Sequence, residues 1–277
     1  MRKPGTAESE RHFVTALSRG LEILRAFGPR EPYLGNAELA ERTGIPRPTV
    51  SRLTATLTRL GYLHHNAHLE KYHLGAGVLA LGYRYLASTG IREIARPHMQ
   101  QLADAADCAV ALGTADRLSM TYLDVCQGQG PLVLRLERAA RLPMMRTAIG
   151  KAWLCAQSPA RREALLQQLA RRDPAYWPTF ERAMDKALAD HAAYGFCLSE
   201  GDWKPEVSAV AVPLVLEEGA EVMALNCGGP SMRLTHRLLV DSLGPRLKET
   251  AERIGATLSL PTRTDADSRT GHEPKGG

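Results

Sequence analysis

NAELAERTGIPRPTVSRLTATLTRLGYL, residues 36–63, predicts two short helices joined by a tight turn. Asn36 can cap the first helix, because its side-chain oxygen can accept a hydrogen bond from a backbone N–H of the first turn. Gly44 tolerates the positive φ of a sharp turn. Pro46 can open the second helix, where its missing N–H costs nothing, and Gly61 can end it. The stretch therefore predicts a helix-turn-helix.

The second helix, residues 47–60, separates apolar from polar side chains. One stripe at helical spacing is expected to face the domain core: Val50, Leu53, Leu57 and Leu60. The residues expected to meet the major groove of double-stranded DNA are Arg47, Pro48, Thr49, Ser51, Arg52, Ala55 and Arg59. Arg52 can bond bidentately to guanine, whereas Arg47 and Arg59 suit phosphate or base-edge contacts. The alternative is an ordinary solvated helix face.

A basic hairpin is predicted directly after this helix. Residues 62–64 and 71–74 alternate like two short strands around a turn. Lys71 and His73 are expected to point outward, where they can follow a phosphate backbone. Two other side chains of the second strand are expected to face inward, Tyr72 and Leu74. The histidines could instead suggest a metal site, but the region has no paired Cys and no His pair at helical i, i+4 spacing, so no metal is expected.

Charge is unevenly distributed along the chain. Residues 1–75 hold 11 Lys or Arg and 7 Asp or Glu, so they carry +4 of the net charge of +5. The same quarter holds five of the nine His. A localised basic excess is typical of nucleic-acid binding, and it agrees with the helix-turn-helix.

Length and composition bound the class of protein. The 277 residues suit two domains, and the apolar (44%) and charged (23%) fractions are ordinary for a globular protein. No stretch of about 18 apolar residues could span a membrane, and the polar start lacks a signal core, so a cytoplasmic location is expected. The five widely spaced Cys are interpreted as free, mostly buried thiols, with a redox-sensing role as the alternative.

The predicted boundaries are a flexible start at 1–12, a winged helix-turn-helix domain at 13–75, a linker helix at 76–89, a second domain at 90–260 and a disordered tail at 261–277. The first domain needs a third helix, predicted at residues 14–27 with a buried stripe of Leu17, Leu21 and Leu24. The apolar linker helix needs a partner, and a second copy of the chain is the simplest one.

The second domain mixes strands and helices. Strands are predicted at 108–113, 119–125, 132–136, 207–216 and 221–227, the last two joined by a turn at 217–219. Helices are predicted at 91–106, 154–169 with a break at Ser158–Pro159, 180–193 and 235–254 with a kink or split at Gly244–Pro245. This order predicts an α+β fold with an antiparallel or mixed sheet and flanking helices.

Six segments in this order resemble the IclR family of bacterial transcriptional regulators, over about residues 12–258. They are ALSRGLEILRAF, NAELAERTGIPRPTVSRLTATLTRLGYL, KYHLGAGVLALG, RLPMMRTAIGKAWL, YGFCLSEGDWKPEVSAVAVPL and LNCGGPSMRLT. The resemblance implies a winged-helix DNA-binding domain, a linker helix and a GAF-like effector-binding domain. It also implies homodimers or dimers of dimers on a palindromic operator, and repression or activation controlled by a small organic metabolite, without a cofactor.

The resemblance also places the effector pocket, in the loop before the GKAWL helix, the EGDW loop and the last hairpin. The residues that match are Met144, Thr147, Ala148, Ile149, Leu198, Ser199, Ala209, Asn226, Cys227 and Gly228. Ala209 and Gly228 offer no side-chain hydrogen bond, so a larger or partly apolar ligand, such as an aromatic acid, fits better than a very small keto acid. Backbone N–H groups near Ala148 suit a carboxylate. The alternative is that these residues only pack a core.

An enzyme with an accessory DNA-binding domain is the alternative function. Ile149-Gly150-Lys151 lacks the upstream Gly of a phosphate-binding loop, and no G-x-S-x-G or H-E-x-x-H motif occurs. Asp202 and Glu206 could pair for acid–base catalysis, but a solvated or capping role is favoured. A purely architectural DNA-binding protein would not need so large a second domain. No catalytic residues are therefore expected.

Overall fold

The computed structural model describes residues 13–130, 136–216 and 221–258. Its internal contacts divide the chain into two compact units, one ending at Ser88 and the other beginning at Thr89. Each unit has its own hydrophobic core. The termini at 1–12 and 261–277, the turn at 217–219 and all but one residue of the strand expected at 132–136 lie outside the described residues.

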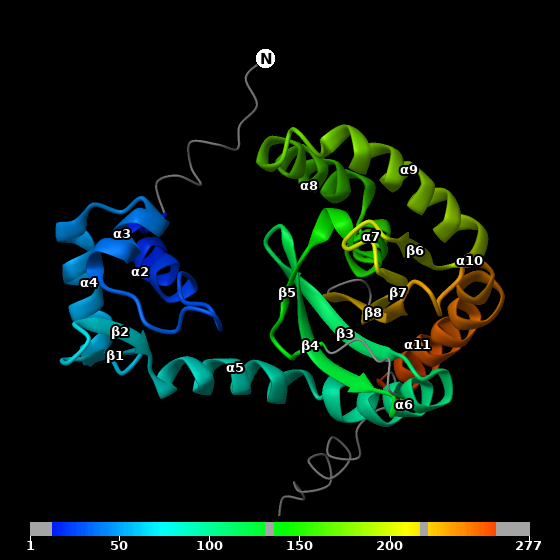
Figure 1. The fold of residues 1–277 in the computed structure, drawn as a ribbon, viewed down its shortest axis with the longest axis horizontal. Helices are drawn as coiled ribbons and strands as arrows, with labels where there is room; N and C mark the ends of the chain where they lie inside the picture. The colour runs from blue at the N-terminus through cyan, green and yellow to red at the C-terminus, as the bar shows by residue number, and fades with distance from the viewer. Residues whose placement is uncertain (1–12, 131–135, 217–220, 259–277) are drawn as a thin grey trace, which may run out of the picture. The chain divides into compact units, whose positions relative to one another are not determined.

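The first unit is a helix-turn-helix followed by a two-stranded hairpin (Figure 1). Its elements are α2 (Thr15–Arg25), α3 (Asn36–Thr43), α4 (Arg47–Arg59), β1 (Leu63–Asn66), β2 (Lys71–Leu74) and α5 (Ala76–Thr89). The core of this unit consists of Ile23, Leu34, Leu39, Ile45, Val50 and Leu63. The helices and the hairpin fall where the sequence predicts them.

Two glycines fix the turns of this unit. Gly44 ends α3 with φ 68°, a left-handed conformation that side chains disfavour. Gly75 lies where the hairpin meets α5, and a Cβ there would come within 2.4 Å of the Gly61 carbonyl oxygen. The expected cap by Asn36 is wrong. Gly35 is the cap residue, and its N–H donates to the Glu38 carboxylate (2.7 Å).

The Asn36 side chain instead joins α3 to α4, because its Oδ1 accepts a hydrogen bond from Thr54 Oγ1 (3.1 Å). Thr54 is fully buried on α4, and this bond satisfies its hydroxyl. A polar residue can therefore occupy a core position that the predicted leucine stripe did not include. The bond holds the two helices at the turn that sets how α4 is presented.

Several leucines predicted as core are exposed. Leu17 and Leu21 of α2 are 63% and 48% exposed, while Gly20 and Ile23 are buried in their place. Leu60 is 63% exposed, because α4 ends at Arg59, and Leu74 at the end of β2 is 38% exposed. Helical spacing finds an apolar face, but it does not tell whether the unit's own core covers that face.

The second unit contains a six-stranded antiparallel sheet in the order β5-β4-β3-β8-β7-β6 (Figure 1). The strands are β3 (Ala109–Asp116), β4 (Ser119–Gln127), β5 (Arg141–Pro143), β6 (Cys197–Glu200), β7 (Val207–Leu216) and β8 (Glu221–Pro230). The predicted α+β class is confirmed. The two edge strands were missed because three and four residues are too few to show an alternating pattern.

Helices cover both faces of this sheet. They are α6 (Ile91–Ala106), α7 (Ala148–Cys155), α8 (Pro159–Arg172), α9 (Trp177–Tyr194), α10 (His236–Leu238) and α11 (Gly244–Leu258), with a π-helical turn at Leu239–Leu243. The break at Ser158–Pro159 and the split at Gly244 agree with the sequence. Figure 1 shows α7 on one face of the sheet and α6 and α11 on the other.

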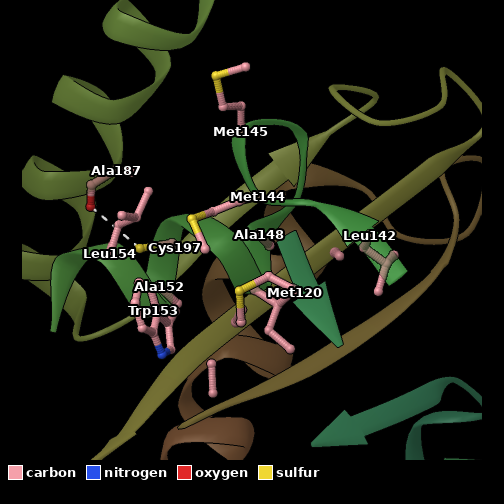
Figure 2. Packing of buried hydrophobic residues seen from close by; sticks show 14 of the residues in the cluster. Met120, Leu142, Met144, Met145, Ala148, Ala152, Trp153, Leu154, Ala187 and Cys197 are labelled. Atoms are coloured by element: carbon pink, nitrogen blue, oxygen red, sulfur yellow. Dashed lines mark hydrogen bonds between the residues drawn. The ribbon is translucent and has the colours of Figure 1, made fainter. Parts of the chain in front are cut away.

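The main core of this unit lies between α7, α9 and the sheet. Figure 2 shows Met120 and Leu142 from the strands packed with α7 residues such as Trp153 and Leu154. Seven of the eight residues of α7 are buried. In the part of the chain that the structure describes, no helix combines the length and apolarity needed to cross a membrane.

Candidate DNA-binding surface and ligand cavity

The outer side of α4 presents the side chains that the sequence assigned to DNA, which we call the α4 face. It consists of Arg47, Pro48, Thr49, Ser51, Arg52, Ala55 and Arg59. All are exposed except Thr49, which is half-buried. Within the described ranges, no acidic side chain pairs with its three arginines. Their guanidinium groups are therefore available to an external anion.

The start of α4 suits close approach to a polyanion. Pro46 is the cap residue, and Pro48 lies in the first turn, where the missing N–H breaks no helical bond. The first turn holds no acidic residue that would repel phosphate. Small side chains at Ser51 and Ala55 leave room between Arg52 and Arg59. This arrangement can enter a major groove and contact both base edges and phosphates.

The hairpin carries the second set of expected contacts, but one of them is already engaged. Lys71 Nζ bonds Glu38 Oε1 of α3 at 2.7 Å. The bond from Lys71, and then that from the Gly35 N–H, hold the pKa of Glu38 below its usual value. A phosphate must therefore compete with Glu38 for Lys71. The His73 ring is half-buried and packs edge-on against Tyr33, 5.4 Å between ring centroids.

Two histidines of the hairpin lie close together. His64 and His73 are register partners, with ring centroids 5.4 Å apart. Across the residues with described positions, no three His, Cys, Asp or Glu side chains are grouped so that they could hold a metal ion.

A cavity opens in the second unit between the start of α7 and the strands β6 to β8. Its volume is about 20 Å³, which is the space of about one water molecule. We call it the ligand cavity, and its lining residues are Tyr122, Leu142, Thr147, Ala148, Ser199, Trp203, Val207, Ala209, Asn226 and Gly228. A ligand larger than water must therefore move side chains apart.

Strand register explains which of the ten expected pocket residues line this cavity. Ser199, Ala209 and Gly228 lie opposite one another on β6, β7 and β8, so these three positions share one face of the sheet. Leu198 and Cys227 are their immediate neighbours and belong to the other face. Six of the ten expected residues line the cavity, namely Thr147, Ala148, Ser199, Ala209, Asn226 and Gly228.

The remaining expected residues do not line it. Met144 and Ile149 are buried in the core cluster around α7, and Leu198 and Cys227 face away for the reason given above. Four lining residues were missed, namely Tyr122, Leu142, Trp203 and Val207. Trp203 lies in the EGDW segment that the resemblance placed at the pocket, so the sequence could have indicated it. Tyr122 and Leu142 reach the cavity only because of the order of the strands in the sheet.

The polar groups of the ligand cavity are neutral. Asn226 Nδ2 donates to the Tyr122 hydroxyl at 3.5 Å, a long bond that a ligand can replace. Burial raises the pKa of Tyr122, so the phenol stays protonated. The Thr147 hydroxyl is engaged twice, accepting from the Gly150 N–H (3.3 Å) and donating to the Pro143 carbonyl (3.0 Å). Thr147 therefore orients α7 and has little capacity left for a ligand.

The two carboxylates of the candidate pair, Asp202 and Glu206, lie in different surroundings. Asp202 accepts a hydrogen bond from the buried Lys151 ammonium (2.6 Å). Glu206, the other member of the candidate pair, is exposed. None of the described residues that line the cavity carries a charged side chain. The described lining residues can bind a ligand by hydrogen bonds and apolar contact.

Family models match both units. A model of the IclR helix-turn-helix domain matches residues 16–67, and a model of the C-terminal region of bacterial IclR transcriptional regulators matches residues 83–256. The chain is 35% identical to the HTH-type transcriptional regulator TsaQ1/TsaQ2 of Comamonas testosteroni over 253 residues, which cover 91% of each chain.

Two further likenesses extend over most of the chain. The p-hydroxybenzoate hydroxylase transcriptional activator of Acinetobacter baylyi is 27% identical, with 87% of this chain and 91% of that protein covered. The crystal structure of an IclR-family transcriptional regulator from Brucella abortus is 47% identical, with a TM-score of 0.85 and coverage of 94% of this chain and 97% of that one.

A helix-turn-helix whose three arginines have no acidic partner among the described residues, carried with a second α+β unit, is typical of a DNA-binding transcriptional regulator. The matches identify which kind. The chain belongs to the IclR family of transcriptional regulators.

Proposed function

We propose that the protein binds a palindromic operator through the α4 face. Its affinity for the operator, or its activity there, changes when a small organic acid, favoured to be aromatic, occupies the ligand cavity. It works in the cytoplasm and is not an enzyme. The single observation that carries the proposed DNA binding is the set of three exposed arginines on α4, which have no acidic partner among the described residues. No observation favours the alternative of an enzyme.

Exposed apolar side chains support a homodimer, or a dimer of dimers. Phe13, just before α2, and Leu17 of α2 are 64% and 63% exposed, and Leu79 and Tyr83 of α5 are 75% and 68% exposed. Large apolar side chains exposed on these elements would be covered in an assembly of two or more copies. A dimer with twofold symmetry carries two α4 faces, which a palindromic operator matches.

The composition of the ligand cavity supports an aromatic carboxylic acid. Leu142, Val207 and the rings of Tyr122 and Trp203 offer apolar contact. Asn226 supplies a neutral donor and acceptor for a ring hydroxyl. The carboxylate would lie against the first turn of α7, where backbone N–H groups favour an anion. One relative is named for its control of p-hydroxybenzoate hydroxylase, which agrees with this class of ligand.

Binding would be coupled to a change in shape. The cavity has room for little more than water, so an aromatic acid must separate α7 from the strands that face it. The ligand can shift the affinity for DNA only by its differential affinity for the two conformations.

Thermal unfolding with added ligand tests the proposal. 4-Hydroxybenzoate should raise the Tm in proportion to the logarithm of its concentration, because it binds the native state alone. Glyoxylate, a two-carbon acid without a ring, serves as the matched control and should raise it less. Equal shifts with both acids would reject the aromatic class, and no shift with either would reject an organic acid as the ligand.

A further inference from the structure

Two of the five cysteines meet where α7 and β6 come together. Cys155 ends α7, Cys197 begins β6, and their Sγ atoms are 3.6 Å apart. Both thiols also point toward the Ala187 carbonyl oxygen of α9, at 3.7 Å from Cys155 and 3.6 Å from Cys197. Figure 2 shows the contact between Cys197 and Ala187. The two sulfurs are thus held together in the reduced form.

We propose that Cys155 and Cys197 form a peroxide-reactive dithiol, whose intramolecular disulfide ties α7 to β6 and so fixes two walls of the ligand cavity. This inference goes beyond the proposed function, and the oxidation itself does not depend on what the cavity binds.

The surroundings assign different roles to the two thiols. Cys155 is half-buried and Cys197 is fully buried, so an oxidant reaches Cys155 first. The hydrogen bond from the Cys197 thiol, and then the positive charges of Arg162 and Lys151, lower the pKa of Cys155. The same hydrogen bond, followed by burial, raises the pKa of Cys197. Cys155 is therefore the attacking thiolate and Cys197 the resolving thiol.

The reaction balances with hydrogen peroxide as the oxidant. The Cys155 thiolate attacks one peroxide oxygen, so an S–O bond forms, the O–O bond breaks and the departing hydroxide takes up a proton as water. Cys197 then loses its proton and attacks the Cys155 sulfur, so the S–S bond forms and the hydroxyl leaves as a second water. Two thiols are oxidised and one peroxide is reduced to two waters.

Closing the bond has a consequence for the cavity. The sulfurs must approach from 3.6 Å to about 2.05 Å. Ala148 in the first turn of α7 and Ser199, two residues after Cys197, both line the cavity. A covalent link between these elements resists the separation that a ligand needs. The oxidised protein should therefore bind its effector more weakly than the reduced protein.

The other cysteines lack this combination of proximity and access. Cys108 shares a thiol hydrogen bond with Cys227, but both are buried, at 2% and 0% exposed. Cys126 is buried as well, and burial raises its pKa. Among the described residues, Cys155 is the cysteine that combines partial exposure with a second sulfur in contact.

Peptide mapping by mass spectrometry tests the pairing. Full-length protein treated with a small excess of hydrogen peroxide should yield one cross-linked peptide pair, containing Cys155 and Cys197, that is lost on reduction. Cys155→Ser should abolish the link, and Cys197→Ser should leave Cys155 as a sulfenic acid that dimedone traps. Cys108→Ser and Cys126→Ser are the controls and should cross-link as the parent does.

Hydrogen exchange tests the consequence without any ligand. Peptides that cover α7 and β6 should exchange their amide hydrogens more slowly after oxidation of the parent protein. In Cys155→Ala treated in the same way, the exchange rates of these peptides should not change. The proposal would be overturned if Cys155 and Cys197 both stayed reduced while other thiols were oxidised. A disulfide that leaves exchange in α7 and β6 unaltered would equally overturn the fixing of the cavity walls.

Discussion

The Lys151 ammonium donates to Asp202 across a gap of 2.6 Å and so joins α7 to the loop that carries Trp203. Lys151 is 4% exposed at its side chain, whereas Asp202 is 33% exposed. The pair therefore fixes one wall of the ligand cavity to another. The lysine is the partner that cannot reach water if the bond is lost.

This asymmetry predicts unequal effects of removing either partner. Asp202→Asn should lower the free energy of unfolding by about 1–3 kcal/mol, because it leaves a buried charge without its counter-ion. Lys151→Met should cost less, since the freed Asp202 can be hydrated. Denaturant unfolding measures both, with the double variant completing the cycle. Additive effects, with no coupling between the two changes, would contradict the assigned pair.

Arg52 on the α4 face should read bases. Arg52→Ala should weaken specific operator binding by about 1–3 kcal/mol and relax the preference for one base. Fluorescence anisotropy with the operator and with single-base variants measures affinity and preference together. Arg182→Ala removes an exposed arginine of α9 and is the matched control. If Arg52→Ala behaves like Arg182→Ala, Arg52 is not a reading residue.

The ion pair between Glu38 and Lys71 predicts a dependence of stability on pH. Because the pKa of Glu38 is lower in the folded state than the unfolded reference of 4.5, the pair stabilises above that pH, and its contribution disappears as pH falls through the folded value. Thermal unfolding from neutral to acid pH should show a smaller loss for Glu38→Gln than for the parent. Glu41→Gln on the same helix should follow the parent. Parallel profiles for all three would exclude a stabilising role for the pair.

Asn226 should separate ligand binding from DNA binding. Asn226→Leu removes the neutral donor and acceptor in the cavity, so 4-hydroxybenzoate should no longer change the Tm or the operator affinity, while operator binding itself persists. The buried Tyr122 hydroxyl loses its partner, which should cost about 1–3 kcal/mol of stability. Gln168→Leu, on the exposed side of α8, is the control. If 4-hydroxybenzoate changes the Tm and the operator affinity of Asn226→Leu as it does those of the parent protein, Asn226 does not contact the ligand.

Local patterns predicted the helix-turn-helix because its signals lie within a few residues of one another. Gly44 and Gly61 marked the ends of α3 and α4 from the sequence alone. Leu17 and Leu21 were predicted to be buried but are exposed, because an exposed apolar face and a face that meets the core have the same spacing. Only the folded unit separates the two.

The ligand cavity was predictable only in part. Ser199, Ala209 and Gly228 were found through the family resemblance, and the register of β6, β7 and β8 then explains why they share one face. Tyr122 reaches the same cavity from β4, which follows β3 in the sheet order, and no local pattern encodes that order. The contact between Cys155 and Cys197 likewise joins residues 42 positions apart.

Binding of the purified protein to the DNA upstream of its own gene tests the central claim most directly, namely that the arginines of α4 contact a duplex. Anisotropy of a labelled fragment should show saturable binding at low ionic strength, and the affinity should fall steeply as salt rises, because phosphate contacts release counter-ions. A fragment of unrelated sequence should bind more weakly. Failure to bind either fragment at low salt would contradict the account.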